Sequence, residues 1–181
     1  MAIIGRLIVG TSGSPGSLQA LRYAEVLAHT HGAALIPVLA WQPPGGDRDE
    51  LIPASAELRR TCLELARQQL RDALLAVWGE VPGDPRVQPR IERGPAGRVL
   101  VSLARCPGDV LVIGAGRRAR LTRVAYCGVS RYCVAHAQCP VLAVPPSALA
   151  SELRRTRLPW AFWHRQLTPQ EILGDQPRPA A

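Results

Sequence analysis

The chain has 181 residues, of which 47% are hydrophobic and 4% aromatic, and its net charge is +8. This length suits one domain at residues 1–146 with an extension at 147–181, and it leaves no room for two full domains. No run of about 18 apolar residues predicts a membrane span, and Arg6 breaks the apolar start, so no secretory signal is predicted and we expect a cytoplasmic protein.

The basic residues are all arginine, 22 in number, and they are spread along the chain. Such a charge can attract nucleic acid or acidic lipid, but these arginines share predicted helices with glutamates, as at residues 57–60. We therefore expect a solvated surface, with no nucleic-acid partner.

The cysteines are odd in number and contain no Cys-x-x-Cys pair, which argues against a disulfide framework and a structural metal site. We expect reduced thiols buried in the core. The five positions are Cys62, Cys106, Cys127, Cys133 and Cys139.

The first half of the chain alternates short apolar runs with amphipathic stretches. Residues 6–10 predict a buried strand, and a helix beginning at Pro15 or Ser17 is expected to stop at Gly32. Residues 34–41 predict the second strand, in which Pro37 cannot donate a hydrogen bond, so a bulge or an unpaired position is expected there. A long helix follows from about residue 54 to just before residue 79.

The second half repeats the pattern. Residues 87–93 predict a strand at the sheet edge because one face is polar and Pro89 interrupts it. A helix begins at Gly94-Pro95 and ends before residues 106–108, and 109–114 predict an internal strand. A last helix at 128–137 and a last strand at 140–145 complete the series.

This alternation of strand and helix with short connections predicts a parallel sheet with helices on both faces. In such a sheet ligands bind beyond the carboxyl ends of the strands. The residues expected at that edge are Thr11, Ser12, Ala40, Trp41 and Gly114.

Four stretches of the chain, 8–15, 112–117, 128–130 and 139–144, resemble the universal stress protein family, and the resemblance extends over about residues 4 to 146. It implies an open five-stranded parallel α/β sheet of order 3-2-1-4-5, a Rossmann-like fold of the adenine nucleotide alpha hydrolase type. It also implies a homodimer, which we expect to form through strand 141–145 because that strand is too apolar to remain a bare edge.

In nucleotide-binding members of that family, a loop of pattern Gly-x2-Gly-x9-Gly-(Ser/Thr) holds the phosphates of ATP through backbone amides. Aligned from Gly114, this chain has Arg117 at the second glycine, Cys127 at the third and Gly128 at the Ser/Thr position. A one-residue insertion would instead place Gly128 at the third glycine. Ser130 matches a further serine near the phosphates.

The resemblance also implies contacts to the nucleoside. The family's nucleotide binders have an aspartate near the end of strand one, where this chain has Ser12, and Ala40 matches a position that contacts adenine through its backbone. A serine cannot supply the paired acceptor oxygens of a carboxylate. The candidate ATP-binding residues are Thr11, Ser12, Ala40, Gly114, Arg117, Gly128, Val129 and Ser130.

Two interpretations of the altered loop remain open. The arginines at 117, 118, 120 and 123 can bind phosphate in place of lost amides, or their side chains can fill the phosphate site. We therefore predict a non-catalytic, dimeric stress-response protein with a modified or lost ATP site, acting as a regulatory or interaction module. The alternatives are an ATP-binding member with slow hydrolysis and a nucleic-acid-binding module that uses the arginine loop.

No histidine has a neighbouring nucleophile and acid that would suggest a hydrolytic triad or a metal site. His29, His31 and His136 are predicted near helix ends, where imidazolium favours the helix terminus. In the extension, we expect the segment 153–165, which contains Trp160 and Trp163, to pack on the domain or across a dimer, and 174–181 to be disordered.

Overall fold

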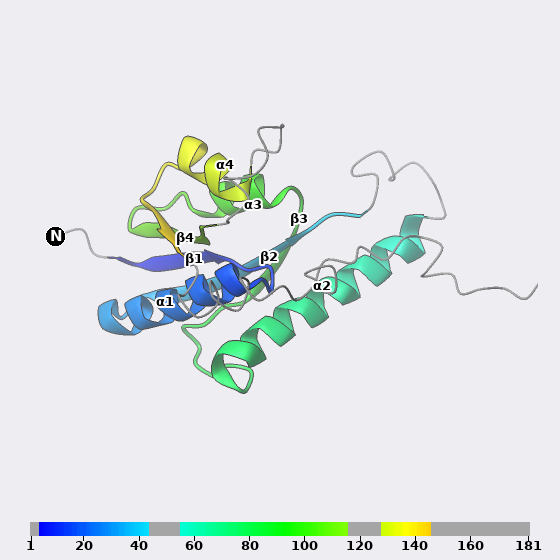
Figure 1. The fold of residues 1–181 in the computed structure, drawn as a ribbon, viewed down its shortest axis with the longest axis horizontal. Helices are drawn as coiled ribbons and strands as arrows, with labels where there is room; N and C mark the ends of the chain where they lie inside the picture. Colours follow the sequence, from blue (N-terminus) through cyan, green and yellow to red (C-terminus); the bar gives the residue numbers. More distant parts are fainter. Residues whose placement is uncertain (1–3, 44–54, 116–127, 146–181) are drawn as a thin grey trace, which may run out of the picture. The chain divides into compact units, whose positions relative to one another are not determined.

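The computed structural model of the chain describes residues 4–43, 55–115 and 128–145 (Figure 1). The predicted sequence of strands and helices is confirmed. The elements are β1 (Arg6–Gly10), α1 (Pro15–His31), β2 (Ala34–Trp41), α2 (Ser55–Trp78), β3 (Arg90–Arg93), α3 (Ala96–Leu103), β4 (Asp109–Gly114), α4 (Val129–His136) and β5 (Val141–Val144).

The sheet has the order β3-β2-β1-β4-β5 and every pair of neighbouring strands is parallel, as predicted. Ile8 of β1 is in register with Ile36 of β2 on one side and with Leu111 of β4 on the other. The chain winds outward from β1 to β3 and then returns to place β4 on the other side of β1. The winding therefore reverses between β1 and β4, which is where ligands bind in sheets of this kind.

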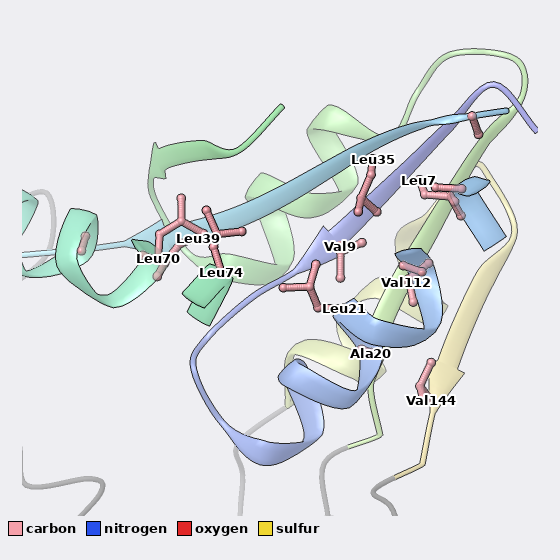
Figure 2. Close-up of a cluster of buried hydrophobic side chains, with 14 residues drawn as sticks. Leu7, Val9, Ala20, Leu21, Leu35, Leu39, Leu70, Leu74, Val112 and Val144 are labelled. Carbon is pink, nitrogen blue, oxygen red and sulfur yellow. The ribbon is translucent and has the colours of Figure 1, made fainter. Parts of the chain in front are cut away.

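Helices cover both faces of the sheet, α1 and α2 on one and α3 and α4 on the other (Figure 1). Because successive side chains of a strand point to opposite faces, Leu7 and Val9 pack under α1 and α2, whereas Ile8 packs under α3. Figure 2 shows the first cluster. Each fully buried leucine or valine contributes about 1.5 to 3 kcal/mol, so these two clusters supply most of the driving force for folding.

The ends of α1 follow from its sequence. Ser14 is the N-cap, its hydroxyl accepts a hydrogen bond from the Ser17 amide, and Pro15 is the first helical residue. Gly32 ends the helix in the left-handed conformation, with φ of 64°. The predicted stop at Gly32 is confirmed, since a residue with a side chain rarely adopts this conformation.

Pro37 lies within β2 without a bulge. The register of β1 with β2 runs unbroken from Arg6 to Gly10. The Leu35 amide donates to the Arg86 carbonyl, toward the β3 side, and by alternation the nitrogen of Pro37 faces the same way. The ladder between β2 and β3 begins only at Val38. At position 37 β2 therefore has no neighbouring strand to which a backbone amide would donate, and proline is tolerated there.

β3 is shorter than the predicted strand at 87–93. Val87 makes an isolated bridge to Leu35, and the regular ladder runs only from Arg90 to Arg93. Pro89, which has no amide hydrogen, lies between the bridge and the ladder. Its predicted position at the edge of the sheet is confirmed.

No helix in the described part of the chain is long and apolar enough to cross a membrane. The predictions for the extension, including the boundary at residue 146, fall on residues outside the described ranges.

Candidate functional site

The carboxyl edge of the sheet brings together candidate residues from three strands. Thr11 and Ser12 follow β1, Ala40 is near the end of β2, and Gly114 ends β4. The Thr11 amide donates to the carbonyl oxygen of Val38 over 2.8 Å, which joins the loop after β1 to β2. Thr11 is 5% exposed, whereas Ser12 is exposed to solvent.

Gly114 lies directly against the first turn of α1. A Cβ atom at this position would be 2.7 Å from both the carbonyl carbon and the carbonyl oxygen of Gly16, and 3.1 Å from the Ser17 nitrogen. Backbone atoms of a helix cannot move aside cheaply, so residue 114 must be glycine for α1 to pack here. The glycine that matches the first position of the phosphate-loop pattern therefore also has a structural role.

Ser130 contacts the same glycine from the other side. Its hydroxyl donates to the carbonyl oxygen of Gly114 over 3.0 Å, which joins the first turn of α4 to the end of β4. A serine hydroxyl has one hydrogen to donate, and this one is directed to the protein backbone.

Ser12 belongs to a cluster of three serines. Its hydroxyl lies 3.0 Å from the Ser14 hydroxyl and 3.3 Å from the Ser17 hydroxyl, and its amide donates to the Ser17 hydroxyl over 3.2 Å. Ser17 in turn donates to the Ser14 carbonyl oxygen over 2.9 Å. The serine that replaces the family's aspartate is therefore bonded within its own loop and the first turn of α1.

Ser14, Ser17 and Gln69 were not among the predicted site residues. The Gln69 side chain donates to the Ser12 carbonyl oxygen over 2.9 Å and so connects the loop to α2. Ser14 carries a sequence signal, because serine is favoured at an N-cap. Gln69 carries none, since the contact joins residues 57 positions apart.

Ala40 is in register with Glu92 of β3, and it lies partly buried in the cluster beneath α3. Ile91 packs in the opposite cluster, so by alternation Glu92 points to the α3 side, as Ala40 does. Glu92 was also not predicted as a site residue. It places a carboxylate one strand away from Ala40.

Gly128 and Val129 begin α4. Gly128 is its N-cap and makes no side-chain capping bond, and Val129 is 41% exposed. Arg117 and Cys127, together with the rest of the arginine-rich loop, lie outside the described residues. Gly114 and Ser130 are thus in contact, while the predicted role of Arg117 stays a prediction.

The described histidines lie at the opposite edge of the sheet. His29 and His31 are in the last turn of α1, and His136 is in the last turn of α4, where its Nδ1 lies 2.9 Å from the Tyr132 carbonyl oxygen. Within the described ranges, no group of three or more His, Cys, Asp or Glu side chains could hold a metal ion.

A partly buried ion pair lies near the opposite, amino edge. Arg6 donates from Nε and Nη2 to the two carboxylate oxygens of Asp109, each over 2.7 Å, and the Cys106 amide donates to Oδ2 over 2.8 Å. Burial alone would raise the pKa of Asp109, but the hydrogen bonds from Arg6 and Cys106 outweigh it and lower the pKa below its usual value. This pair joins β1 to β4 and stabilises the sheet.

The described hydroxyl groups at this edge are already engaged within the protein. A phosphate is an acceptor and needs donors, but the hydroxyls of Thr11, Ser12 and Ser130 all have acceptors within the protein. Ser12 also lacks the two acceptor oxygens that a carboxylate offers to a nucleoside.

The sequence profile of the universal stress protein family matches residues 4–145. No curated protein matches the chain.

Solved structures show the same fold. The universal stress protein UspA from Lactobacillus plantarum is 23% identical, with a TM-score of 0.62, and the match covers 80% of this chain and 99% of that one. A universal stress protein from Archaeoglobus fulgidus is 18% identical, with a TM-score of 0.53, over 78% of this chain and 98% of that one. At these identities the likeness concerns the fold alone.

Proposed function

Because the chain belongs to the universal stress protein family, we propose that it is a non-catalytic stress-response protein whose nucleotide site is weakened or lost. It acts in the cytoplasm as a dimeric module that regulates or binds other proteins. The site in question is the carboxyl edge at Ser12, Gly114 and Ser130.

The hydrogen bond from Ser130 to the Gly114 carbonyl oxygen carries this proposal. A nucleotide bound as in the family's ATP-binding members would need donors at this place, yet the one hydrogen of the Ser130 hydroxyl is already bound. Breaking that bond leaves a carbonyl oxygen without its partner, which costs about 1 kcal/mol or more. ATP therefore has to compete with the protein for the same donor.

The loops at this edge support a non-catalytic role. Their described residues, at 11–14, 42–43, 94–95, 115 and 128, include no Asp, Glu or His. Hydrolysis of a phosphate needs a group that positions or activates water, and a metal ion or cation that neutralises charge. Glu92 lies within β3, and its register partner is Ala40, not a residue of the phosphate loop.

The exposed edge of the sheet supports the dimer. Within the described residues β5 pairs with β4 alone, and its residues Val141 and Leu142 are partly exposed. An unpaired apolar edge strand is an aggregation risk unless another strand or element covers it. Pairing of two β5 strands around a two-fold axis removes the risk for both copies at once.

The proposal is tested by extracting nucleotide from protein purified without added ATP and by measuring phosphate release from ATP. A weak site loses its ligand during purification, so the extract should contain far less than one nucleotide per chain, and phosphate release should equal the blank. Stoichiometric ATP in the extract would contradict the weakened site. Release of phosphate above the blank that is lost on Ser130→Ala would contradict the non-catalytic role.

A further inference from the structure

On one face of the sheet, α4 is the helix next to the edge formed by β5. α3 packs on β1 and β2, whereas α4 packs on β5 and against α3. The side of α4 that points away from α3 is therefore the side toward the edge of β5, where the described residues place no further strand.

The side of α4 toward this edge carries an exposed valine. The Tyr132 ring packs against Gly97 of α3, and Cys133 points to the sheet with 0% exposure. Because successive residues of a helix are turned by about 100°, Ser130 and Val134 point away from α3 and toward the edge. Val134 is 64% exposed. It borders an open hollow of about 340 Å³, whose described lining is Ser130, Arg131, Val134 and Ala135.

The other face has a matching surface on α1. This helix packs on β4 and β5, and its residues share a buried cluster with Val144 of β5 (Figure 2). Arg22 and Glu25 form hydrogen bonds with residues of α2, so they mark the side of α1 toward α2. By the same rotation, Tyr23 and Leu27 lie on the opposite side, toward β5. Tyr23 is 46% exposed and Leu27 is partly exposed.

β5 alone is a small contact surface. It has four residues, Val141–Val144, and such a strand spans about 13 Å. Stable protein interfaces bury about 800 Å² on each partner, which is far more than one edge strand of this length offers. A stable dimer at this edge therefore needs contact surface beside the strand.

The two-fold symmetry of the proposed dimer brings both surfaces against a second copy. Antiparallel pairing of two β5 strands places the two-fold axis perpendicular to the sheet, so each face of the sheet continues into the same face of the partner. α4 then meets the partner's α4, and α1 meets the partner's α1. The paired helices run antiparallel, so Arg131 in the first turn of α4 approaches the negative end of the partner's helix dipole.

We propose that two apolar flanks complete the dimer interface, the α4 flank (Ser130 and Val134) and the α1 flank (Tyr23 and Leu27). Val134 of each copy enters the hollow beside the partner's α4, and the α1 flanks pack on each other on the other face. This inference rests on the proposed dimer and names the residues that give it affinity. Backbone hydrogen bonds between strands are the same for any sequence, so the flanks determine which chain is accepted as partner.

A second copy fits this surface because it covers all three parts at once. A partner that covers β5 and both flanks must itself present an apolar edge strand between two helices. The edge of this chain has that form, and a two-fold axis makes it complementary to itself. An isolated peptide strand would pair with β5 but would leave Val134 and Tyr23 exposed.

The test is the dissociation constant of the dimer, measured by sedimentation equilibrium on the full-length protein. Val134→Asp and Tyr23→Asp should each weaken the dimer at least about 10-fold, because each change occurs twice in a two-fold interface and places a carboxylate in an apolar contact. Since these side chains lie on the surface of the single chain, far-ultraviolet circular dichroism spectra should match that of wild type.

Val26→Asp is the matched control. Val26 is 63% exposed, as Val134 is, but it lies on the side of α1 that faces solvent, away from both the sheet and α2. This variant adds the same charge outside the proposed flanks. It should leave the dissociation constant unchanged.

The outcomes separate the flanks from the dimer itself. A wild-type dimer whose dissociation constant is unchanged in Val134→Asp and Tyr23→Asp would overturn the flanks but leave the proposed dimer standing. An equal loss of affinity in Val26→Asp would also overturn them, because added charge alone would then explain the effect. If Val134→Asp stays dimeric and melts at a lower temperature, another part of the same chain covers this face and the α4 flank is wrong. A monomeric wild type would contradict the proposed dimer.

Discussion

Gly114 and Gly16 touch through their backbones, but only one of them has to be glycine. A Cβ atom on Gly114 would lie 2.7 Å from the Gly16 carbonyl group, whereas a Cβ atom on Gly16 would have no atom within 4 Å. The contact joins the end of β4 to the first turn of α1 at the point where the winding of the sheet reverses.

Gly114→Ala is therefore expected to destabilise the protein by about 1 to 3 kcal/mol, because the added methyl group forces β4 and α1 apart. Gly16→Ala is expected to be neutral or slightly stabilising, since alanine is the better helix former. Chemical denaturation of the two variants measures the difference. Equal stability of both variants would show that the contact is not as tight as described.

Removing the carboxylate of Asp109 tests the ion pair with Arg6. Asp109→Asn is expected to lower the free energy of unfolding by about 1 to 3 kcal/mol at pH 7, because the partly exposed Arg6 loses its ionic partner. Asp84→Asn, in an exposed pair with Arg86, is the matched control and should change stability little.

The effect of Asp109→Asn should depend on pH. The folded pKa of Asp109 is lowered, so its stabilisation is fully present above the unfolded pKa of about 3.9 and is lost as the pH falls through the folded value. The difference in unfolding free energy between wild type and variant should therefore shrink when the pH falls from about 5 to about 3. A difference that stays constant over this range would contradict the ionic role.

The buried thiol of Cys133 should be unreactive. Burial, with a smaller contribution from Cys139, raises its pKa to about 11, and its side chain is 0% exposed. At pH 8 about one thiol in a thousand would be ionised even if reagent could reach it. In the native protein, iodoacetamide should label the exposed Cys106 well before Cys133, as followed by peptide mass spectrometry. Labelling of both at one rate would contradict this.

The dimer prediction can be tested at a single backbone amide. The carbonyl oxygens of Pro140 and Val144 accept hydrogen bonds from β4, so by alternation the amide of Ala143 faces the free edge. Ala143→Pro removes that outward donor but leaves the ladder with β4 intact. In light scattering at tens of micromolar, wild type should have twice the chain mass of 19.5 kDa and Ala143→Pro should have the monomer mass. A monomeric wild type would contradict the proposed interface.

Most of the fold could be predicted from the conformational properties of single residues and from the spacing of apolar residues. The stop of α1 at Gly32 and the edge position of β3 depend on properties of single residues, the left-handed conformation of glycine and the missing amide of proline. The length of β3 was overestimated because Pro89 was used only to place the strand at the edge, whereas its missing amide also separates the bridge at Val87 from the ladder that begins at Arg90.

The site was predicted less completely, because its hydrogen bonds join distant parts of the chain. A sequence motif placed Gly114 in a phosphate loop. The structure shows that the backbone of α1 leaves no room for a side chain at this position. Likewise, the bond from Ser130 to Gly114 and the bond from Gln69 to Ser12 depend on how α4 and α2 pack on the sheet. Such partners follow from tertiary structure.

The most direct test of the weakened nucleotide site is calorimetric titration of nucleotide-free protein with ATP and magnesium. Competition from the Ser12 and Ser130 hydrogen bonds predicts a dissociation constant weaker than about 100 μM, or no measurable heat. A submicromolar dissociation constant that is unchanged by Arg117→Ala would contradict it, because the backbone alone would then hold the nucleotide.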